Sequence, residues 1–229
     1  MVVNNKIPLT TEAYDTIKQQ IIDLHLRPGE IIMVQQLARK LGISRTPVRE
    51  ALVRLKNEGL VDSAEGRKFK VCELTLDTIM EIYDIREYLE SLAIERVSET
   101  ITSIQMRHLG NIVVKMKDAL EHKDYDSFFE HDSNFHNYII EACGNKILKS
   151  LMKQLSDKVQ RIRYLTININ KRPEDSIGEH MQILECLKSN DREGAKSVLQ
   201  KHLSNVKVGL KALFEDTDKN FFGRSFLIM

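Results

Sequence analysis

The sequence predicts a mainly α-helical protein with a small N-terminal part, residues 1–74, and a larger all-α helical bundle, residues 75–229. Apolar residues recur at helical spacing along most of the chain, and strand-like runs are confined to one stretch before residue 74. Hydrophobic residues make up 42% of the 229 residues, which is enough for a core. Only four residues are proline, so long helices are unobstructed.

The formal net charge of +1 conceals a small asymmetry between the two parts. Residues 1–74 carry 12 Lys and Arg against 9 Asp and Glu, whereas residues 75–229 carry 22 against 24. A mildly basic small domain on a mildly acidic larger one is compatible with nucleic-acid binding by the first. The three cysteines form no CxxC pair, and no apolar run approaches the ~18 residues of a membrane span, so we expect a cytoplasmic protein.

Residues 42–60 are predicted to form a tight turn followed by one well-marked helix. Ser44 or Thr46 can cap the start of this helix, and Pro47 suits its first turn. Gly59 is placed to end the helix in a left-handed conformation. The apolar stripe that we expect to be buried consists of Val48, Ala51, Leu52 and Leu55.

Three polar side chains lie off that stripe near the start of the helix, namely Arg45, Thr46 and Arg49. Two guanidinium groups and a hydroxyl at a helix start suit a reader of the DNA major groove. The helix start can meet phosphate while arginine forks pair with guanine O6 and N7. An ordinary surface helix with solvated arginines would show the same short pattern, so the neighbouring segments must decide.

The segments around this helix favour DNA binding. Amphipathic helices are predicted over residues 12–26 and 34–41, and the second is joined to residues 42–60 through a glycine turn, as in a helix-turn-helix. Two strand-like runs then flank a hairpin tip that carries Gly66 and Arg67. This hairpin is a candidate wing, because glycine allows close backbone approach to a ligand.

These segments resemble the GntR family of bacterial transcription regulators. The resemblance is carried by LRPGE at 26–30, LGISRTPVREAL at 41–52 and GLV at 59–61. It implies a winged helix-turn-helix whose third helix enters the major groove and whose wing tip reaches the minor groove. By matching position, the residues expected to contact DNA are Arg45, Thr46, Arg49 and Gly66, with Arg67 beside them at the tip.

The chain departs from the family pattern at the start of the second helix. Family members often have Ser or Thr as the cap there, followed by a charged residue, whereas this chain has Met33, Val34 and Gln35. Methionine cannot accept a capping hydrogen bond. A contact made from that helix in relatives would have to be supplied here by Gln35 or Arg39.

Six helices are predicted after residue 74, and together they make an all-α bundle. We expect them at about 75–100, 102–123, 125–143, 145–166, 176–189 and 191–215, with a polar loop at 168–175. A capping-box pattern, Thr102 with Gln105, opens the second helix. The inward residues of the first helix are predicted to be Ile79, Ile82, Tyr83, Ile85, Leu89, Leu92 and Ala93. The apolar tail, residues 221–229, has no predicted place.

One carboxylate and three imidazoles form a candidate metal site in the bundle. Asp132 and His136 are four positions apart on one helix and share a face. His180 and His202 lie on the last two helices. Such a set would suit Zn²⁺, Ni²⁺ or a similar divalent ion. The pattern alone does not separate this site from unrelated histidines, because an Asp-x-x-x-His pair is common.

Residues 75–215 resemble the all-helical FCD ligand-binding domain of the FadR subfamily. The resemblance is carried by IREYLE at 85–90, DSNFH at 132–136, ACGN at 142–145, and the pairs at 179–180 and 202–203. It implies a divalent metal, Zn²⁺ or Ni²⁺, held by Asp132, His136, His180 and His202. It also implies that Arg86 faces the same cavity and pairs with an effector carboxylate. The alternative for Arg86 is an ion pair with Glu90 on its own helix.

The expected function is that of a homodimeric DNA-binding transcription regulator, a repressor, that responds to a small carboxylate effector bound near the metal. Its expected partners are a double-stranded DNA operator, the effector and a second copy of the chain, with no membrane. The alternative is a metal-dependent hydrolase fused to a DNA-binding domain, because an open metal position can activate water. The sequence contains no HExxH, nucleophile elbow or phosphate loop, so we expect no enzyme.

Overall fold

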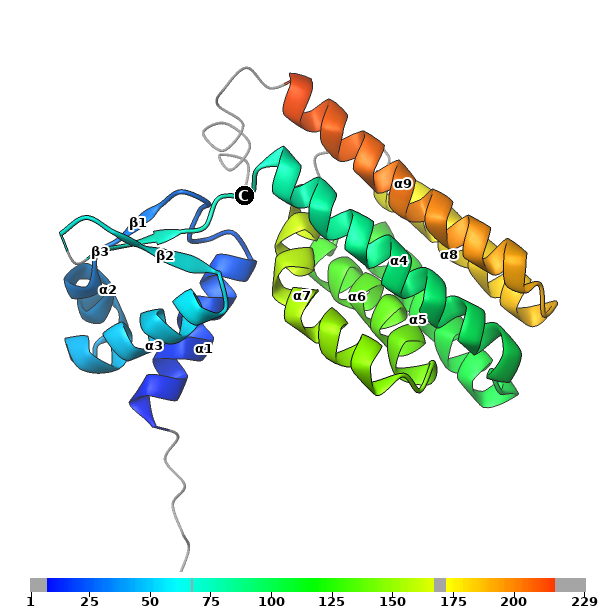
Figure 1. Cartoon of the computed structure of the whole chain (residues 1–229), viewed down its shortest axis with the longest axis horizontal. Coiled ribbons are helices and arrows are strands. Elements are labelled where there is room, and N and C mark those ends of the chain that lie inside the picture. Colours follow the sequence, from blue (N-terminus) through cyan, green and yellow to red (C-terminus); the bar gives the residue numbers. More distant parts are fainter. Residues whose placement is uncertain (1–7, 67, 167–171, 217–229) are drawn as a thin grey trace, which may run out of the picture. The chain divides into compact units, whose positions relative to one another are not determined.

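The structure is a computed structural model of the chain, and it describes residues 8–66, 68–166 and 172–216 (Figure 1). These residues form two compact units, which divide between Leu74 and Thr75. Arg67, which was expected at the wing tip beside Gly66, lies outside the described part, and so does the tail at 221–229. Among the described residues, no helix has the length and hydropathy needed to cross a membrane.

The first unit contains three helices and a small antiparallel sheet. Its elements in chain order are α1 (Leu9–Ile22), β1 (Ile31–Ile32), α2 (Val34–Leu41), α3 (Arg45–Asn57), β2 (Val61–Ala64) and β3 (Lys68–Val71). The strand order is β1-β3-β2, with Ile32 opposite Phe69 and Val61 opposite Val71. The sheet therefore holds the β2–β3 hairpin, the predicted wing, against the rest of the unit.

Helix α3 is fixed by its glycine turns and its apolar stripe. Gly42 and Gly59 both adopt a positive φ, near +70°, which glycine reaches without the Cβ clash of other residues. Pro47 lies in the first turn, where no backbone donor is needed. The predicted stripe, Val48, Ala51, Leu52 and Leu55, is fully buried. Its packing against α1 leaves the opposite face of α3 exposed.

Two features of the first unit differ from the sequence prediction. Helix α1 begins at Leu9 and ends at Ile22, so it lies several residues earlier than predicted. Strand β1 was not predicted, because it is only two residues long and gives no alternation to recognise.

The second unit is the predicted bundle of helices. The described helices are α4 (Leu76–Thr100), α5 (Ser103–Glu121), α6 (Tyr125–Ala142), α7 (Lys146–Thr166), α8 (Arg172–Lys188) and α9 (Arg192–Asp216). The capping box of Thr102 and Gln105 is formed at the start of α5. Asn145 Oδ1 accepts hydrogen bonds from the backbone N–H groups of Ile147 and Leu148 at the start of α7. The fold class is therefore mainly α, as predicted.

Helix α8 is longer than the sequence predicted. It begins at Arg172 rather than Ser176, so the second half of the expected polar loop is helical. Pro173 is compatible with this because it lies in the first turn, where its missing N–H leaves no hydrogen bond unmade. The earlier start brings Arg172 into the interior, where its side chain is buried.

The inward face of α4 also differs from the prediction. Ile85 and Leu92 were expected to be buried, but they are 53% and 40% exposed. Arg86 and Glu90 occupy the inward positions instead, and each is only 1% exposed. The prediction is confirmed for Ile79, Ile82, Tyr83 and Ala93, which are buried. It was wrong at Ile85 and Leu92, because a hydrophobicity pattern cannot locate the part of a face whose residues are charged.

We expect Thr102→Ala to lower the free energy of unfolding of the helical unit by about 0.5–2 kcal/mol, because the Thr102 hydroxyl caps α5. Thr102→Ser keeps the hydroxyl and should retain most of that stability. Urea titration followed by circular dichroism measures both variants. Wild-type stability in Thr102→Ala would contradict a role for this cap.

Candidate nucleic-acid interface and candidate metal centre

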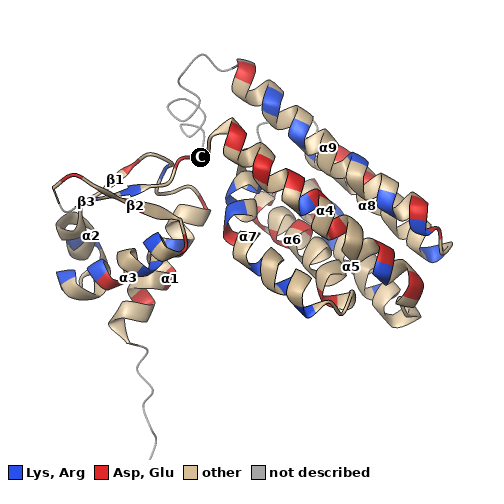
Figure 2. Ribbon diagram, viewed as in Figure 1, with Lys and Arg blue, Asp and Glu red and all other residues tan. Residues whose placement is uncertain are grey.

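A concave surface of the first unit lies between α2, the start of α3 and the tip of the β2–β3 hairpin. It encloses about 740 Å³. Its lining residues are Met33, Val34, Gln35, Gln36, Arg39, Arg45, Thr46, Arg49, Glu50, Gly66 and Lys68. The structure thus brings together all the described residues that the sequence suggested for DNA contact. Figure 2 shows the Lys and Arg residues of α2 and α3 in blue.

The side chains in this groove are available to a ligand. Arg45, Thr46 and Arg49 are all exposed at the start of α3, and Gln35 and Arg39 are exposed on α2. An exposed helix start with guanidinium groups matches the size and donor chemistry of a DNA major groove. Gly66 has a φ of +71°, and a Cβ at this position would meet only the end of the Lys68 side chain.

Sequence reasoning did not single out two residues of the groove. Gln36 lies beside Gln35 on α2 and is exposed, so it adds a second amide that can pair with adenine. Glu50 adds a carboxylate, whose Oε2 accepts a hydrogen bond of 2.9 Å from Thr10 Oγ1. That bond joins α1 to α3, so a structural role accounts for the presence of Glu50 in the groove.

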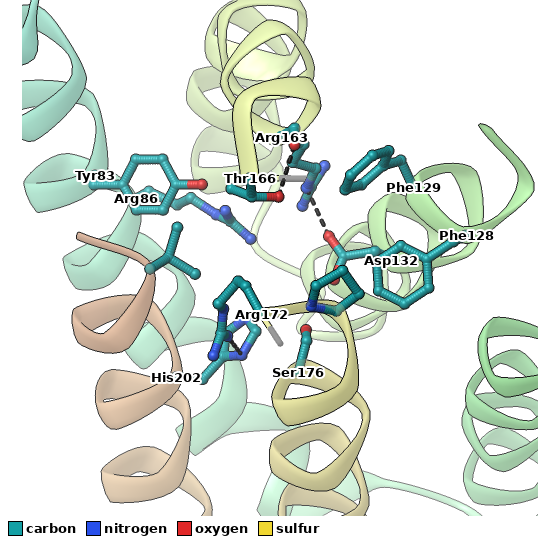
Figure 3. Close-up of a pocket in the computed structure, with 12 residues that line it drawn as sticks. Tyr83, Arg86, Phe128, Phe129, Asp132, Arg163, Thr166, Arg172, Ser176 and His202 are labelled. Atoms are coloured by element: carbon teal, nitrogen blue, oxygen red, sulfur yellow. Dashed lines mark hydrogen bonds and ion pairs between the residues drawn. The ribbon is translucent and has the colours of Figure 1, made fainter. Parts of the chain in front are cut away.

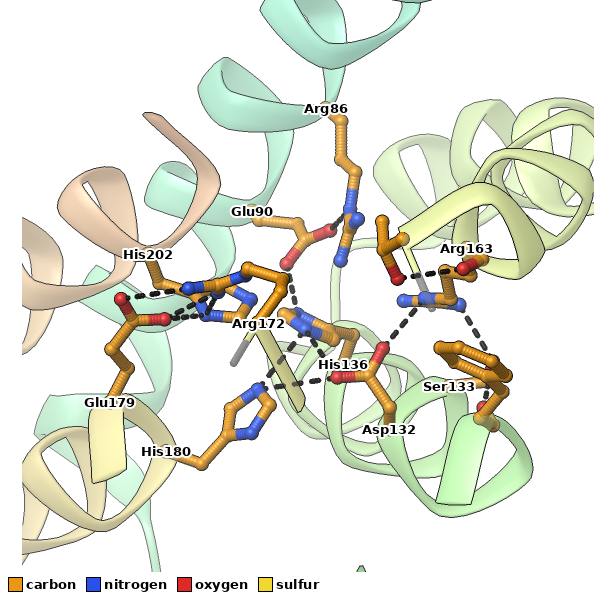
Figure 4. A network of polar contacts seen from close by, with 12 residues as sticks. Arg86, Glu90, Asp132, Ser133, His136, Arg163, Arg172, Glu179, His180 and His202 are labelled. Atoms are coloured by element: carbon orange, nitrogen blue, oxygen red, sulfur yellow. Dashed lines mark hydrogen bonds and ion pairs between the residues drawn. The ribbon is translucent and has the colours of Figure 1, made fainter. Parts of the chain in front are cut away.

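The second unit brings the predicted Asp and His side chains together in its interior (Figure 4). Asp132 and His136 come from α6, His180 from α8 and His202 from α9. One ligand atom from each lies within 4.8 Å of the others, and all four residues are buried. The spacing on α6 explains the first pair, because residues four apart lie on the same face of a helix.

The distances within this cluster fit a divalent ion. His136 Nε2 and His180 Nε2 are 3.3 Å apart. Two nitrogens bound at about 2.1 Å to one metal would be separated by about 3.0–3.4 Å, depending on coordination geometry. Asp132 Oδ1 lies 3.9 Å from His136 Nε2 and 3.7 Å from His180 Nε2. The donor set, three imidazoles and one carboxylate, is one that Zn²⁺ and Ni²⁺ accept.

Two further carboxylates hold the other nitrogen of two of these imidazoles. Glu90 Oε2 lies 2.6 Å from His136 Nδ1, and Glu179 Oε2 lies 2.7 Å from His202 Nδ1. Such a carboxylate accepts the Nδ1–H proton, which fixes the ring and leaves Nε2 free to bind a metal. Sequence reasoning missed both roles, because the partners are 46 and 23 positions apart in the chain.

Asp132 and the two supporting carboxylates, Glu90 and Glu179, each pair with an arginine. Arg86 Nε pairs with Glu90 Oε1, as the alternative prediction for Arg86 proposed. Arg163 Nε pairs with Asp132 Oδ2 at 2.7 Å. Arg172 binds Glu179 through both of its terminal nitrogens. All three guanidinium groups are buried, so removal of any carboxylate would leave a cation without its partner in a low-dielectric interior.

A small cavity adjoins the cluster (Figure 3). Its volume is about 20 Å³, which is enough for about one water molecule. The lining residues are Tyr83, Arg86, Phe128, Phe129, Asp132, Arg163, Thr166, Arg172, Pro173, Ser176, His202 and Val206. Arg86 Nη2 is buried and has no hydrogen-bond partner among the described residues. Arg86 thus pairs with Glu90, as the alternative prediction proposed, and it also lines the cavity, while its pairing with an effector carboxylate stays a prediction.

The protonation states favour metal binding. Burial lowers the pKa of His180 to about 3 and also depresses the pKa values of His136 and His202. Burial alone would raise the pKa of Asp132, but the charge of Arg163 holds it below its usual range. At neutral pH the cluster thus offers neutral imidazoles and an ionised carboxylate, which are the forms that bind metal.

We expect the metal-free helical unit to lose stability as the pH falls from 7.5 to 5. The unfolded chain takes up protons on histidine below about pH 6.5, whereas the buried imidazoles resist protonation. Each such histidine contributes at most about 1.4 kcal/mol per pH unit. Urea titrations after chelator treatment measure the slope, and His180→Gln should reduce it. Stability that is constant or rises on acidification would contradict the depressed pKa values.

Comparison with known proteins agrees with both units. Residues 9–71 match the family described as bacterial regulatory proteins, gntR family, and residues 81–205 match the FCD domain. YdhC of Bacillus subtilis, an HTH-type transcriptional regulator, is 29% identical over 93% of this chain and 96% of its own. RspR of Escherichia coli, an HTH-type transcriptional repressor, is 23% identical over 96% of each chain.

A solved structure has the same fold along most of the chain. The structure of Escherichia coli McbR/YncC superposes with a TM-score of 0.74 at 26% sequence identity. It covers 90% of this chain and 99% of its own. The likeness therefore spans the helix-turn-helix unit and the helical unit together. The chain belongs to the GntR family of DNA-binding transcription regulators and carries an FCD domain after its helix-turn-helix.

Proposed function

We propose that this protein is a repressor of the FadR subfamily in which a divalent metal and a small carboxylate effector control operator binding. The observation that carries the proposal is the convergence of Asp132, His136, His180 and His202 beside a buried, partly unpaired arginine. The relative RspR is named a repressor, and so is a 28% identical regulator of the Bacillus subtilis gluconate operon. A protein with this role acts on DNA in the cytoplasm.

The groove of the first unit would receive the operator. In this proposal Arg45 and Arg49 read base edges in the major groove, Thr46 binds phosphate, and Gly66 and Arg67 enter the minor groove. Gln35 and Arg39 supply the contact from α2. All of these except Arg67, which lies outside the described residues, line one groove of about 740 Å³.

The cluster of the second unit would hold Zn²⁺ or Ni²⁺ through Asp132, His136, His180 and His202. The ion supplies a positive charge and a coordination position for water or a carboxylate oxygen. Glu90 and Glu179 orient two of the imidazoles, and Arg163 holds the second oxygen of Asp132. Because Arg163 pairs with Oδ2, Oδ1 would be the oxygen of Asp132 that is available to a metal.

The size of the cavity indicates how an effector would act. A cavity of about 20 Å³ holds about one water molecule, so a carboxylic acid with several heavy atoms needs more room. The cavity is lined by residues of α4, α6, α7, α8 and α9, and binding must therefore displace helices. Helix α4 begins five residues after β3 ends, so its displacement can be transmitted to the DNA-binding unit. Coupling of about 1–3 kcal/mol is typical of such linkage.

The proposed regulator is a homodimer. Two helix-turn-helix units related by a two-fold axis would bind the two halves of a pseudo-palindromic operator. Helix α4 exposes apolar side chains, among them Ile85 and Tyr88, which are 53% and 78% exposed. An exposed apolar patch on a helix is typical of a protein interface.

We expect Arg49→Ala to weaken specific operator binding by about 1–3 kcal/mol, because a bidentate contact to guanine would be lost. An operator selected from a random duplex library allows the affinity to be measured by fluorescence anisotropy. Lys40→Ala is the matched control, since Lys40 is an exposed cation of α2 outside the groove lining. An unchanged affinity in Arg49→Ala would contradict the assignment of the groove.

We expect His180→Ala to lower the bound metal per chain, because one of four ligands would be removed from the buried cluster. Elemental analysis after loading with Zn²⁺ and dialysis measures the stoichiometry. His108→Ala is the control, because His108 is exposed on α5 and lies outside the cluster. Wild-type metal content in a folded His180→Ala protein would refute the proposed site.

A further inference from the structure

Glu90 lies between Arg86, the proposed effector anchor, and His136, a proposed metal ligand (Figure 4). One oxygen, Oε1, pairs with Arg86 Nε, and the other, Oε2, lies 2.6 Å from His136 Nδ1. Glu90, Arg86 and His136 are each no more than 2% exposed. A single buried carboxylate thus contacts both partners at once.

The two hydrogen bonds of Glu90 compete for the same negative charge. A carboxylate that accepts the Nδ1–H of a histidine increases the electron density at Nε2 and strengthens that nitrogen as a metal ligand. A guanidinium on the other oxygen withdraws part of that charge, and in a low-dielectric interior hydrogen bonds of a network polarise one another. The charge of Arg86 therefore determines how much negative charge Glu90 offers to the Nδ1–H group of His136, and so how strongly Nε2 can bind a metal.

Arg86 can donate to a second anion in addition to Glu90. Its Nε is bound by Glu90, but Nη2 is buried without a partner among the described residues, and Arg86 lines the cavity. An anion that enters the cavity can accept from Nη2. The charge of the guanidinium is then divided between the anion and Glu90.

We propose that Glu90 couples anion binding at Arg86 to metal binding at His136. An anion on Arg86 releases negative charge of Glu90 toward His136, which strengthens the bond of His136 to the metal. Linkage requires the reverse effect, so bound metal tightens anion binding by the same factor. This inference rests on the proposed function, and it makes Glu90 a positioning residue between the two ligands.

Glu179 is the natural comparison within the same site. It also accepts from an arginine, Arg172, and holds a histidine, His202, by an Oε2 to Nδ1 distance of 2.7 Å. Its Oε1 additionally accepts from Asn205 Nδ2 at 2.6 Å. Glu179 also lines a surface groove between α8 and α9. No hydrogen bond or ion pair among the described residues joins Glu179 to Arg86, so Glu179 should support the metal regardless of what Arg86 binds.

The test is a double-mutant cycle on zinc affinity in the full chain. Competition with a chromophoric chelator gives the Zn²⁺ affinity of the wild type, Arg86→Gln, Glu90→Gln and the double variant. We expect Glu90→Gln to weaken Zn²⁺ binding by about 10- to 100-fold. Arg86→Gln should tighten it, and the tightening should be at least about threefold larger when Glu90 is present.

Two controls separate a relay from a simple charge effect. In the Glu179→Gln background, Arg86→Gln should tighten zinc by the same factor as in the wild type. With Co²⁺ in place of Zn²⁺, Glu90→Gln should shift the visible absorption bands, because these bands report the ligand field at the ion, to which His136 would contribute. Should Arg86→Gln misfold, acetate replaces the substitution, and it should tighten Zn²⁺ more in the wild type than in Glu90→Gln.

The outcomes distinguish this inference from the function on which it rests. An equal effect of Arg86→Gln with and without Glu90, or an equal effect of acetate, would overturn the relay while leaving the metal site in place. A wild-type protein that takes up no Zn²⁺ would overturn the metal site and the relay together.

Discussion

The helical unit depends on the pairing of buried charges at its centre. Asp132, Glu90 and Glu179 each face a guanidinium group. Asp132 and Glu90 are buried in the bundle, and Glu179 is half-buried between α8 and α9. Removal of charge from water costs several kcal/mol per ion, so such pairs persist only where the geometry is close and further hydrogen bonds support the ions. The ion pairs lie on α4, α6, α7 and α8, and the hydrogen bonds of Glu179 to His202 and Asn205 add α9 to the same network. The imidazoles of His136 and His202 contact two of these carboxylates, which fix the orientation of the rings.

This arrangement explains why the centre is suited to ligands rather than only to stability. An apolar core of the same volume would be simpler and as stable, because buried ion pairs seldom add net stability. The network instead holds three neutral imidazoles and a carboxylate oxygen close enough for one ion, and it leaves Arg86 Nη2 without a partner. A bound metal and an anion would complete the hydrogen bonding and coordination of these groups. In the proposed function, ligand binding and the packing of α4 would therefore be parts of one equilibrium.

The sequence was most informative where local chemistry determines the structure. Gly42 and Gly59 mark the turns before and after α3, and Pro47 suits the first turn of a helix, so α3 was predicted closely. The spacing of Asp132 and His136 likewise placed both on one face of α6. The fold of the bundle followed from helical periodicity and from the resemblance to a known family. The start of α8 was missed because polar residues and Pro173 resemble a loop.

The supporting residues of the site could not be predicted from the sequence. Glu90 contacts His136 only because α4 packs against α6, and no local sequence pattern connects positions that are 46 residues apart. Arg86 and Glu90 are charged residues at inward positions, so the apolar pattern of α4 wrongly indicated Ile85 and Leu92 as buried. Such long-range pairings depend on the tertiary packing, which periodicity does not contain.

X-ray absorption spectroscopy of the zinc-loaded full chain tests the central claim most directly. We expect a first shell of three imidazole nitrogens at about 2.0–2.1 Å with at least one oxygen at about 2.0–2.2 Å, and a multiple-scattering pattern of histidine rings. A shell of oxygen atoms alone, or one that contains sulfur at about 2.3 Å, would contradict it.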